Sequence, residues 1–190
     1  MNSNIYTNPS QHLSGMVTTG AQDSLMRPAH PVPHRWLGLV LWIALCMAVG
    51  VIDGALFQPG AWFDGLEKPF FNPPAAVFAP VWTVLYVLMG VAAWRVWTLR
   101  KSAERRQALR QFLVQLVLNG IWTPVFFGAQ SLAGGLVVIV LLDIAIMVTI
   151  QRFHPLDKIA AWLLAPYLAW VTFATALNVA LLALNGNFGA

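Results

Sequence analysis

The sequence predicts an all-α membrane protein, built as a bundle of five transmembrane helices. Hydrophobic residues make up 58% of the 190 residues and charged residues only 9%, whereas about a quarter of the residues in soluble domains are charged. Five apolar stretches are each close to the roughly 20 residues that a helix needs to cross the hydrocarbon core of a bilayer. None alternates polar and apolar residues as the strands of a membrane β-barrel do. The lipid bilayer is therefore an expected partner.

The chain begins with a polar segment, residues 1–34, that shows no hydrophobic period. It contains Pro28, Pro31 and Pro33, which would interrupt a helix. We therefore predict a disordered cytoplasmic tail, followed by a transmembrane domain over residues 35–190. The helices of this domain are predicted at residues 36–52, 79–98, 109–128, 132–150 and 159–184.

The one long connection between the predicted helices spans residues 53–78. It is rich in aromatic residues and proline, including Trp62, Phe70 and Phe71. Because so apolar a segment is poorly solvated by water, we predict that it packs over the helix ends as a lid. An aromatic belt at the membrane interface is the alternative.

The basic residues predict how the chain is oriented in the membrane. With five crossings, ten of the eleven Lys and Arg residues fall on one side: Arg27, Arg35, Arg95, Arg100, Lys101, Arg105, Arg106, Arg110, Arg152 and Lys158. Lys68 alone falls on the other side. Cytoplasmic loops collect Lys and Arg, so an integral multi-pass protein with a cytoplasmic N-terminus and an external C-terminus is expected, assuming insertion into an inner membrane.

Three of the predicted helices carry polar and aromatic residues together on one face. The faces comprise Phe78, Trp82, Tyr86, Met89 and Ala93; Gln115, Asn119, Trp122 and Phe126; and Tyr167, Trp170, Ala174 and Asn178. Polar groups in hydrocarbon are costly unless they are paired, which predicts that these faces point inward. The residues alone leave two interpretations open: ordinary helix packing or the wall of a ligand cavity.

Asp143 is a carboxylate near the middle of the fourth predicted helix. By depth it matches Asn119 and Tyr167, so we predict a structural cluster in which the three side chains share hydrogen bonds. A proton or ion site is the functional alternative.

Several functional classes are disfavoured by what the sequence contains. Its basic residues punctuate apolar runs, so nucleic acid is not an expected partner. The histidines, His12, His30, His34 and His154, lie in the tail or a loop, which predicts neither an intramembrane metal cluster nor an axial haem ligand. We therefore assign no metal site, no catalytic residue and no required cofactor.

Long, irregular motifs stand at residues 68–74 (KPFFNPP), 78–86 (FAPVWTVLY) and 166–170 (PYLAW), the last continuing through Ala174 to Asn178. Shorter ones are residues 119–122 (NGIW) and Leu142-Asp143. In these motifs the chain resembles the translocator protein family, also called tryptophan-rich sensory proteins or peripheral-type benzodiazepine receptors. The short C-terminus is similar to that of bacterial members.

The resemblance implies a five-helix bundle, often a homodimer, that binds tetrapyrroles such as protoporphyrin IX and haem. In the family the pocket is lined by the first, second, third and fifth helices and closed by the first loop. The ligand-binding residues that this implies here are Trp62, Pro73, Pro74, Trp82, Asn119, Trp122, Tyr167, Trp170 and Ala174. The cholesterol pattern of animal members needs a Tyr and a basic residue after Asn178, and this chain has neither.

The function expected from the resemblance is tetrapyrrole binding, by a sensor or carrier in tetrapyrrole metabolism and stress regulation. One alternative is an enzyme for light-dependent porphyrin breakdown, with Trp62 or Trp170 as the redox partner of the excited ligand. The other is a transporter of porphyrins or other small metabolites. The absence of an inverted repeat and the single predicted intramembrane carboxylate disfavour a transporter.

Overall fold

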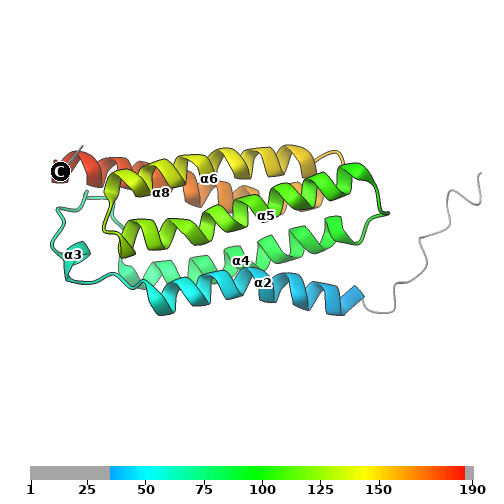
Figure 1. Cartoon of the computed structure of the whole chain (residues 1–190), viewed down its shortest axis with the longest axis horizontal. Helices are drawn as coiled ribbons and strands as arrows, with labels where there is room; N and C mark the ends of the chain where they lie inside the picture. The colour runs from blue at the N-terminus through cyan, green and yellow to red at the C-terminus, as the bar shows by residue number, and fades with distance from the viewer. Residues whose placement is uncertain (1–34, 187–190) are drawn as a thin grey trace, which may run out of the picture. The chain divides into compact units, whose positions relative to one another are not determined.

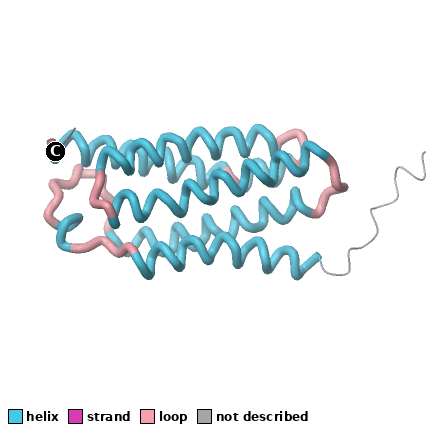
Figure 2. Tube along the Cα trace, viewed as in Figure 1, coloured by secondary structure: helices cyan, strands magenta, loops and turns pink. Residues whose placement is uncertain are grey.

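The computed structural model describes residues 35–186, which form five long, roughly parallel helical segments and a short helix at one end (Figures 1 and 2). The predicted tail, residues 1–34, lies outside the described residues. The long segments comprise α2 (Arg35–Leu56), α4 (Ala75–Trp97), α5 (Ala103–Thr123) with η1 (Pro124–Gly128), α6 (Leu132–Phe153), and α7 (Lys158–Leu163) with α8 (Ala165–Asn185). All five are long and apolar enough to cross a membrane. The predicted all-α architecture with five transmembrane helices is confirmed.

The helix ends near the lid differ from the predicted ones. The helix α2 runs to Leu56, one turn beyond the end of the apolar stretch, and so includes Asp53. The helix α4 begins at Ala75, directly after Pro74. The charge of Asp53 marked the end of the hydrophobic run but does not end the helix, because its side chain is buried within the bundle. The predicted lid therefore contributes residues to two helices.

Two prolines explain the irregular turns in the third and fifth segments. Proline has no N–H, and its ring clashes with the carbonyl four residues earlier, so it disturbs the regular α-helical pattern, although α4 continues through Pro80. At Pro124 the chain widens into the π-helical turn η1. In the fifth segment the helix is interrupted at Leu164, two residues before Pro166, which separates α7 from α8.

The five segments form a closed ring, in which each segment packs against at least two others. The helix α2 packs on α4 and α5, α5 on α6, α6 on α8, and α4 on the α7–α8 segment. The helices α2 and α4 pack closely at Gly90, where a Cβ atom would lie 2.6 Å from the Cα atom of Ile43. A side chain at Gly90 would push these two helices apart.

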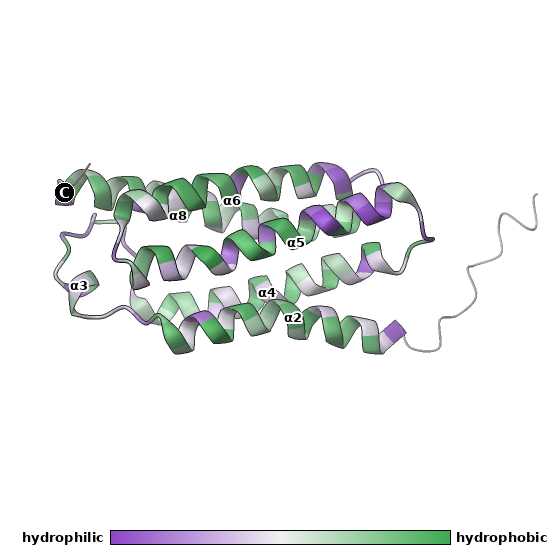
Figure 3. Cartoon of the chain, viewed as in Figure 1, coloured by the Kyte–Doolittle hydropathy of each residue, from purple (hydrophilic) through white to green (hydrophobic). Residues whose placement is uncertain are grey.

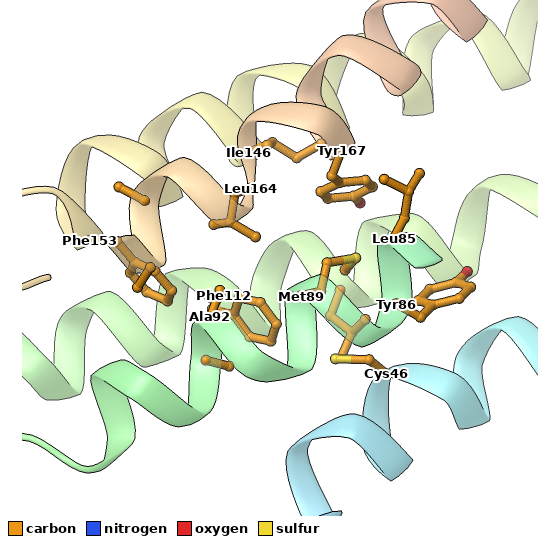
Figure 4. Close-up of a cluster of buried hydrophobic side chains, with 14 of the residues drawn as sticks. Cys46, Leu85, Tyr86, Met89, Ala92, Phe112, Ile146, Phe153, Leu164 and Tyr167 are labelled. Carbon is orange, nitrogen blue, oxygen red and sulfur yellow. The ribbon is translucent and has the colours of Figure 1, made fainter. Parts of the chain in front are cut away.

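A hydrophobic core fills the half of the bundle away from the lid. Its largest fully buried side chains include Phe112, Phe153, Met89 and Leu164, from α5, α6, α4 and the α7–α8 junction (Figure 4). At that end Arg95 and Asp157 form an ion pair of 2.9 Å. Asp157 also caps α7 by accepting a hydrogen bond from the backbone N–H of Ala160.

The connection between α2 and α4 lies at the other end of the bundle, beside the end of α8 (Figure 1). It contains the short helix α3 (Ala61–Asp64). Trp62, Phe63 and Leu66 of this connection pack against a second buried cluster that includes Phe126, Leu177 and Leu181. The part of the lid around α3 therefore packs against the helices, whereas Phe70 farther along the lid is fully exposed.

Candidate functional site: an aromatic cavity beneath the lid

A cavity of about 840 Å³ opens between the lid and the helices. All five long segments contribute to its wall, together with the lid, and the lining is predominantly apolar. The fourth segment, α6, contributes Ile139 and Leu142, although the resemblance implied a pocket built from the other four. A cavity of this size and character is typical of a site for a small, largely apolar ligand.

Three tryptophans from different helices face this cavity: Trp82 on α4, Trp122 on α5 and Trp170 on α8. Each is supported by another ring. Trp82 stacks on Tyr86 with centroids 5.3 Å apart, and Trp122 stacks on Phe126 at 4.8 Å. Trp170 meets Phe78 edge-to-face at 5.8 Å. Such pairs hold the rings in defined orientations, so the wall offers several ordered aromatic surfaces to a flat ligand.

A hydrogen-bonded chain of three side chains lies at the inner part of the cavity. The Tyr86 hydroxyl donates to Asn119 Oδ1 over 2.8 Å, and Asn119 Nδ2 donates to the Tyr167 hydroxyl over 3.2 Å. All three residues are buried, and Figure 4 shows Tyr86 and Tyr167 on facing helices. The chain fixes the Asn119 amide and links α4, α5 and α8 below the aromatic wall.

The lid closes the outer part of the cavity with Phe63, Asn72, Pro73 and Pro74. Lys68 holds this part of the chain in shape. Its ammonium donates to the backbone oxygen of Asp64 over 3.0 Å and lies 5.0 Å from the centre of the Phe63 ring. One cationic side chain thus connects α3 to the segment before Pro73 and Pro74.

The structure brings most of the predicted site residues to one cavity. Seven of the nine lie in its wall: Pro73, Pro74, Trp82, Asn119, Trp122, Trp170 and Ala174. The other two lie behind it. Trp62 packs edge-to-face on Phe126 at 5.9 Å, and the fully buried Tyr167 supports Trp82 and Asn119. Both therefore stabilise the wall without facing the cavity.

Sequence reasoning missed several residues of the wall, of which Asp53 is the most polar. The loop assignment hid it, although Met47, Gly50 and Gly54 follow the spacing of one helical face with it and all line the cavity. Phe126 lies on the predicted inward face but was not named as a ligand-binding residue, and Phe127 was missed, because its position depends on the π-helical turn at Pro124.

The predicted cluster of Asp143 with Asn119 and Tyr167 is wrong. Asp143 instead accepts hydrogen bonds from Thr172 over 3.1 Å and from Thr175 over 2.8 Å. Equal depth along the helices placed the three residues at one level but not on facing sides. Asp143 therefore connects α6 to α8 outside the cavity.

Within residues 35–186, no group of three His, Cys, Asp or Glu side chains is arranged to hold a metal ion. The polar groups of the cavity wall are instead hydroxyls, amides and isolated charges. This arrangement supports binding through shape, aromatic contact and hydrogen bonds.

Comparison with known proteins agrees with this architecture. The sequence profile of the TspO/MBR family matches residues 42–184. The chain is 42% identical over 152 residues to the tryptophan-rich sensory protein of Cereibacter sphaeroides, covering 80% of this chain and 94% of that protein. It is 46% identical over 153 residues to the tryptophan-rich protein TspO of Chlorobaculum tepidum, covering 78% and 96%.

Similarity extends to animals. The human translocator protein is 38% identical over 139 residues, covering 70% of this chain and 82% of the human protein. The matched residues include the lid, the three cavity tryptophans and all or most of each long helical segment. The chain is thus an integral multi-pass membrane protein that belongs to the TspO/MBR family.

Proposed function

We propose that the protein binds a tetrapyrrole, such as a porphyrin or haem, and acts as a sensor or carrier of that ligand. The observation that carries this proposal is the cavity of about 840 Å³ with tryptophans on three of its sides. A tetrapyrrole is flat, mostly apolar and extended enough to reach several of these rings at once. Aromatic contacts contribute about 0.5–1.5 kcal/mol each beyond the apolar area that they bury.

The names of the relatives favour the same class of function. One relative is called a sensory protein and another a translocator protein. In this protein the hydrogen-bonded side chains of Tyr86, Asn119 and Tyr167 fix the inner wall of the cavity, and the lid forms a separate outer wall. This arrangement is suited to enclosing a ligand.

Fluorescence titration of the purified protein in detergent micelles tests the proposal. Protoporphyrin IX is expected to quench tryptophan emission saturably, because Trp82, Trp122 and Trp170 line the cavity. Replacing all three by Phe keeps an aromatic wall but removes the indole contacts, so the dissociation constant from the titration should rise. Replacing Trp62 by Phe is the control, since Trp62 packs behind the wall and should change the dissociation constant little. Absence of saturable binding by the wild-type protein would overturn the proposal.

Light-dependent breakdown of a bound porphyrin is a second candidate, favoured by the position of Trp170 in the wall. An indole at the cavity surface can donate an electron to an excited ligand, with dioxygen as the terminal oxidant. Illumination of the complex in air is then expected to give a new absorption spectrum, and Trp170→Phe should slow its appearance. Trp62 faces away from the cavity and is the weaker of the two redox candidates.

The orientation proposed for the protein places the lid outside and the connections α4–α5 and α6–α7 in the cytoplasm. Hydrophilic residues gather at the end of the bundle that holds the connections α4–α5 and α6–α7 (Figure 3). Arg100, Lys101, Arg105 and Arg152 lie there, whereas Lys68 lies in the lid. A reporter that is active only in the cytoplasm, fused after Ala190, should stay silent in an inner-membrane host. Strong reporter activity would place the C-terminus in the cytoplasm and overturn the proposed orientation.

A further inference from the structure

Asp53 places a carboxylate in the wall of an otherwise largely apolar cavity. It lies in the last turns of α2, and its residue is only 8% exposed. The neighbouring Gly54 has open space where a side chain would be, since a Cβ atom there would meet nothing within 4 Å. The helix thus leaves room for a ligand next to this carboxylate.

The hydrogen-bonding capacity of Asp53 is not used up by the described part of the chain. The one ion pair within residues 35–186 joins Arg95 to Asp157, so no cation there neutralises Asp53. The Thr123 hydroxyl lies beside Asp53 and can donate to it. Tyr86 lines the same cavity, but its single hydroxyl proton is donated to Asn119, so it offers Asp53 no donor. A carboxylate accepts about four hydrogen bonds, and one hydroxyl supplies one of them.

The other charged side chains of the wall lie in the lid. Asp64 is exposed, and the Lys68 ammonium is held by the backbone oxygens of Asp64 and Leu66. Asp53 is therefore the buried carboxylate of the cavity wall, and burying it with only one donor is unfavourable. A ligand that brings N–H groups to this position supplies those donors.

We propose that Asp53 accepts hydrogen bonds from the pyrrole N–H groups of an open-chain tetrapyrrole, and so favours such ligands over metal-loaded rings. The inference rests on the proposed tetrapyrrole binding and names the ligand class within it. In haem the metal replaces the pyrrole protons, so the ring offers Asp53 no donor. Open-chain tetrapyrroles have N–H groups that are not enclosed by a rigid macrocycle, and these donors can reach a carboxylate in the wall.

The test compares two ligands that both carry propionates and differ in their N–H groups. Biliverdin, an open-chain tetrapyrrole, has N–H donors. Nickel(II) protoporphyrin IX has none, and its square-planar metal avoids axial binding by the carboxylate itself. Each affinity is measured for wild type, Asp53→Leu and Asp53→Asn, so that each ligand serves as its own reference.

Asp53→Leu is expected to weaken biliverdin binding about tenfold or more, as the loss of a charge-assisted hydrogen bond implies. It should leave the affinity for the nickel complex unchanged or increased, and Asp53→Asn should lie between. Glu67→Gln is the matched control, because it removes an exposed carboxylate of the lid that does not line the cavity and should change neither affinity.

An equal response of both ligands to Asp53→Leu would overturn the role of Asp53 while leaving tetrapyrrole binding intact. Failure of both ligands to bind the wild-type protein would instead overturn the proposed function. If Asp53→Leu does not fold, Asp53→Asn carries the comparison, since it keeps the size and shape of the side chain. A reduced preference for biliverdin over the nickel complex in that variant supports the assignment, and an unchanged preference contradicts it.

Discussion

Asn185 and Glu67 exchange two hydrogen bonds across 118 positions of the chain. The backbone N–H of Glu67 donates to Asn185 Oδ1 over 2.9 Å, and Asn185 Nδ2 donates to the backbone oxygen of Glu67 over 3.0 Å. Asn185 is the last residue of α8, followed by Gly186 with a φ of 68°. The lid is thus tied to the end of the helix that carries Trp170 and Ala174 into the cavity.

Asn185→Ala is predicted to loosen the lid. It removes both hydrogen bonds to Glu67, each with a net contribution of about 0.5–1.5 kcal/mol, so lid opening should become about tenfold more frequent. Amide hydrogen exchange at Glu67 and through α3 should accelerate, and ligand association and dissociation should both speed up. Asn185→Asp keeps the acceptor for the Glu67 N–H and should show a smaller effect. Unchanged exchange in Asn185→Ala would contradict this role.

The second prediction concerns the hydrogen bond from Tyr86 to Asn119. Tyr86→Phe keeps the ring that stacks on Trp82 but leaves a buried acceptor on Asn119 unpaired, which should destabilise the protein by about 1–3 kcal/mol. In an Asn119→Leu background that acceptor is absent, so the same change should have little effect. Thermal unfolding of the four proteins in micelles measures the coupling. Equal destabilisation in both backgrounds would show that the hydrogen bond contributes nothing.

The sequence predicts the helices better than the contacts between them. Hydrophobic length identifies five membrane spans because the bilayer sets a minimum length that any spanning helix must meet. The ends are less well defined, since an apolar run stops at the first charge while α2 continues past Asp53. A buried carboxylate facing a cavity and one that ends a helix look the same in the sequence.

The candidate site follows the same pattern. Helical spacing correctly predicts that Asn119 and Trp122 share an inward face, because that relationship lies within one helix. Depth alone wrongly assigns Asp143 to Asn119, because contact also depends on how each helix is rotated about its axis. The position of Trp62 behind the wall depends on the fold of the lid, which has no periodicity to indicate it.

Asp143→Asn is predicted to keep the fold and the ligand affinity. Thr175 lies within hydrogen-bonding distance of both Asp143 and the backbone oxygen of Val171. With an amide in place of the carboxylate, Thr175 can donate to Val171 and accept from the new N–H₂ group. The expected loss of unfolding free energy is below about 1 kcal/mol. A well-folded variant that binds the ligand but no longer carries or breaks it down would instead indicate that Asp143 handles a proton.

The last prediction tests whether the inner face of α8 is a binding surface. Ala174 lines the cavity beside Trp170 and Val171, where its small side chain leaves space for a ligand. Ala174→Leu extends the side chain into that space and remains compatible with a membrane helix. We expect the variant to fold and to lose porphyrin affinity by well over tenfold, because the leucine occupies part of the binding volume.

Ala176→Leu is the matched control on the same helix, since Ala176 is exposed on the outer side of the bundle. The same change there adds equal bulk and hydrophobicity but should leave porphyrin affinity unchanged. Ordinary packing at Ala174 predicts a different result, because an overfilled core loses about 1–3 kcal/mol of stability. Melting temperature and porphyrin affinity, measured on both variants, separate the two cases. A destabilised Ala174→Leu protein that still binds porphyrin normally would exclude Ala174 from the binding surface.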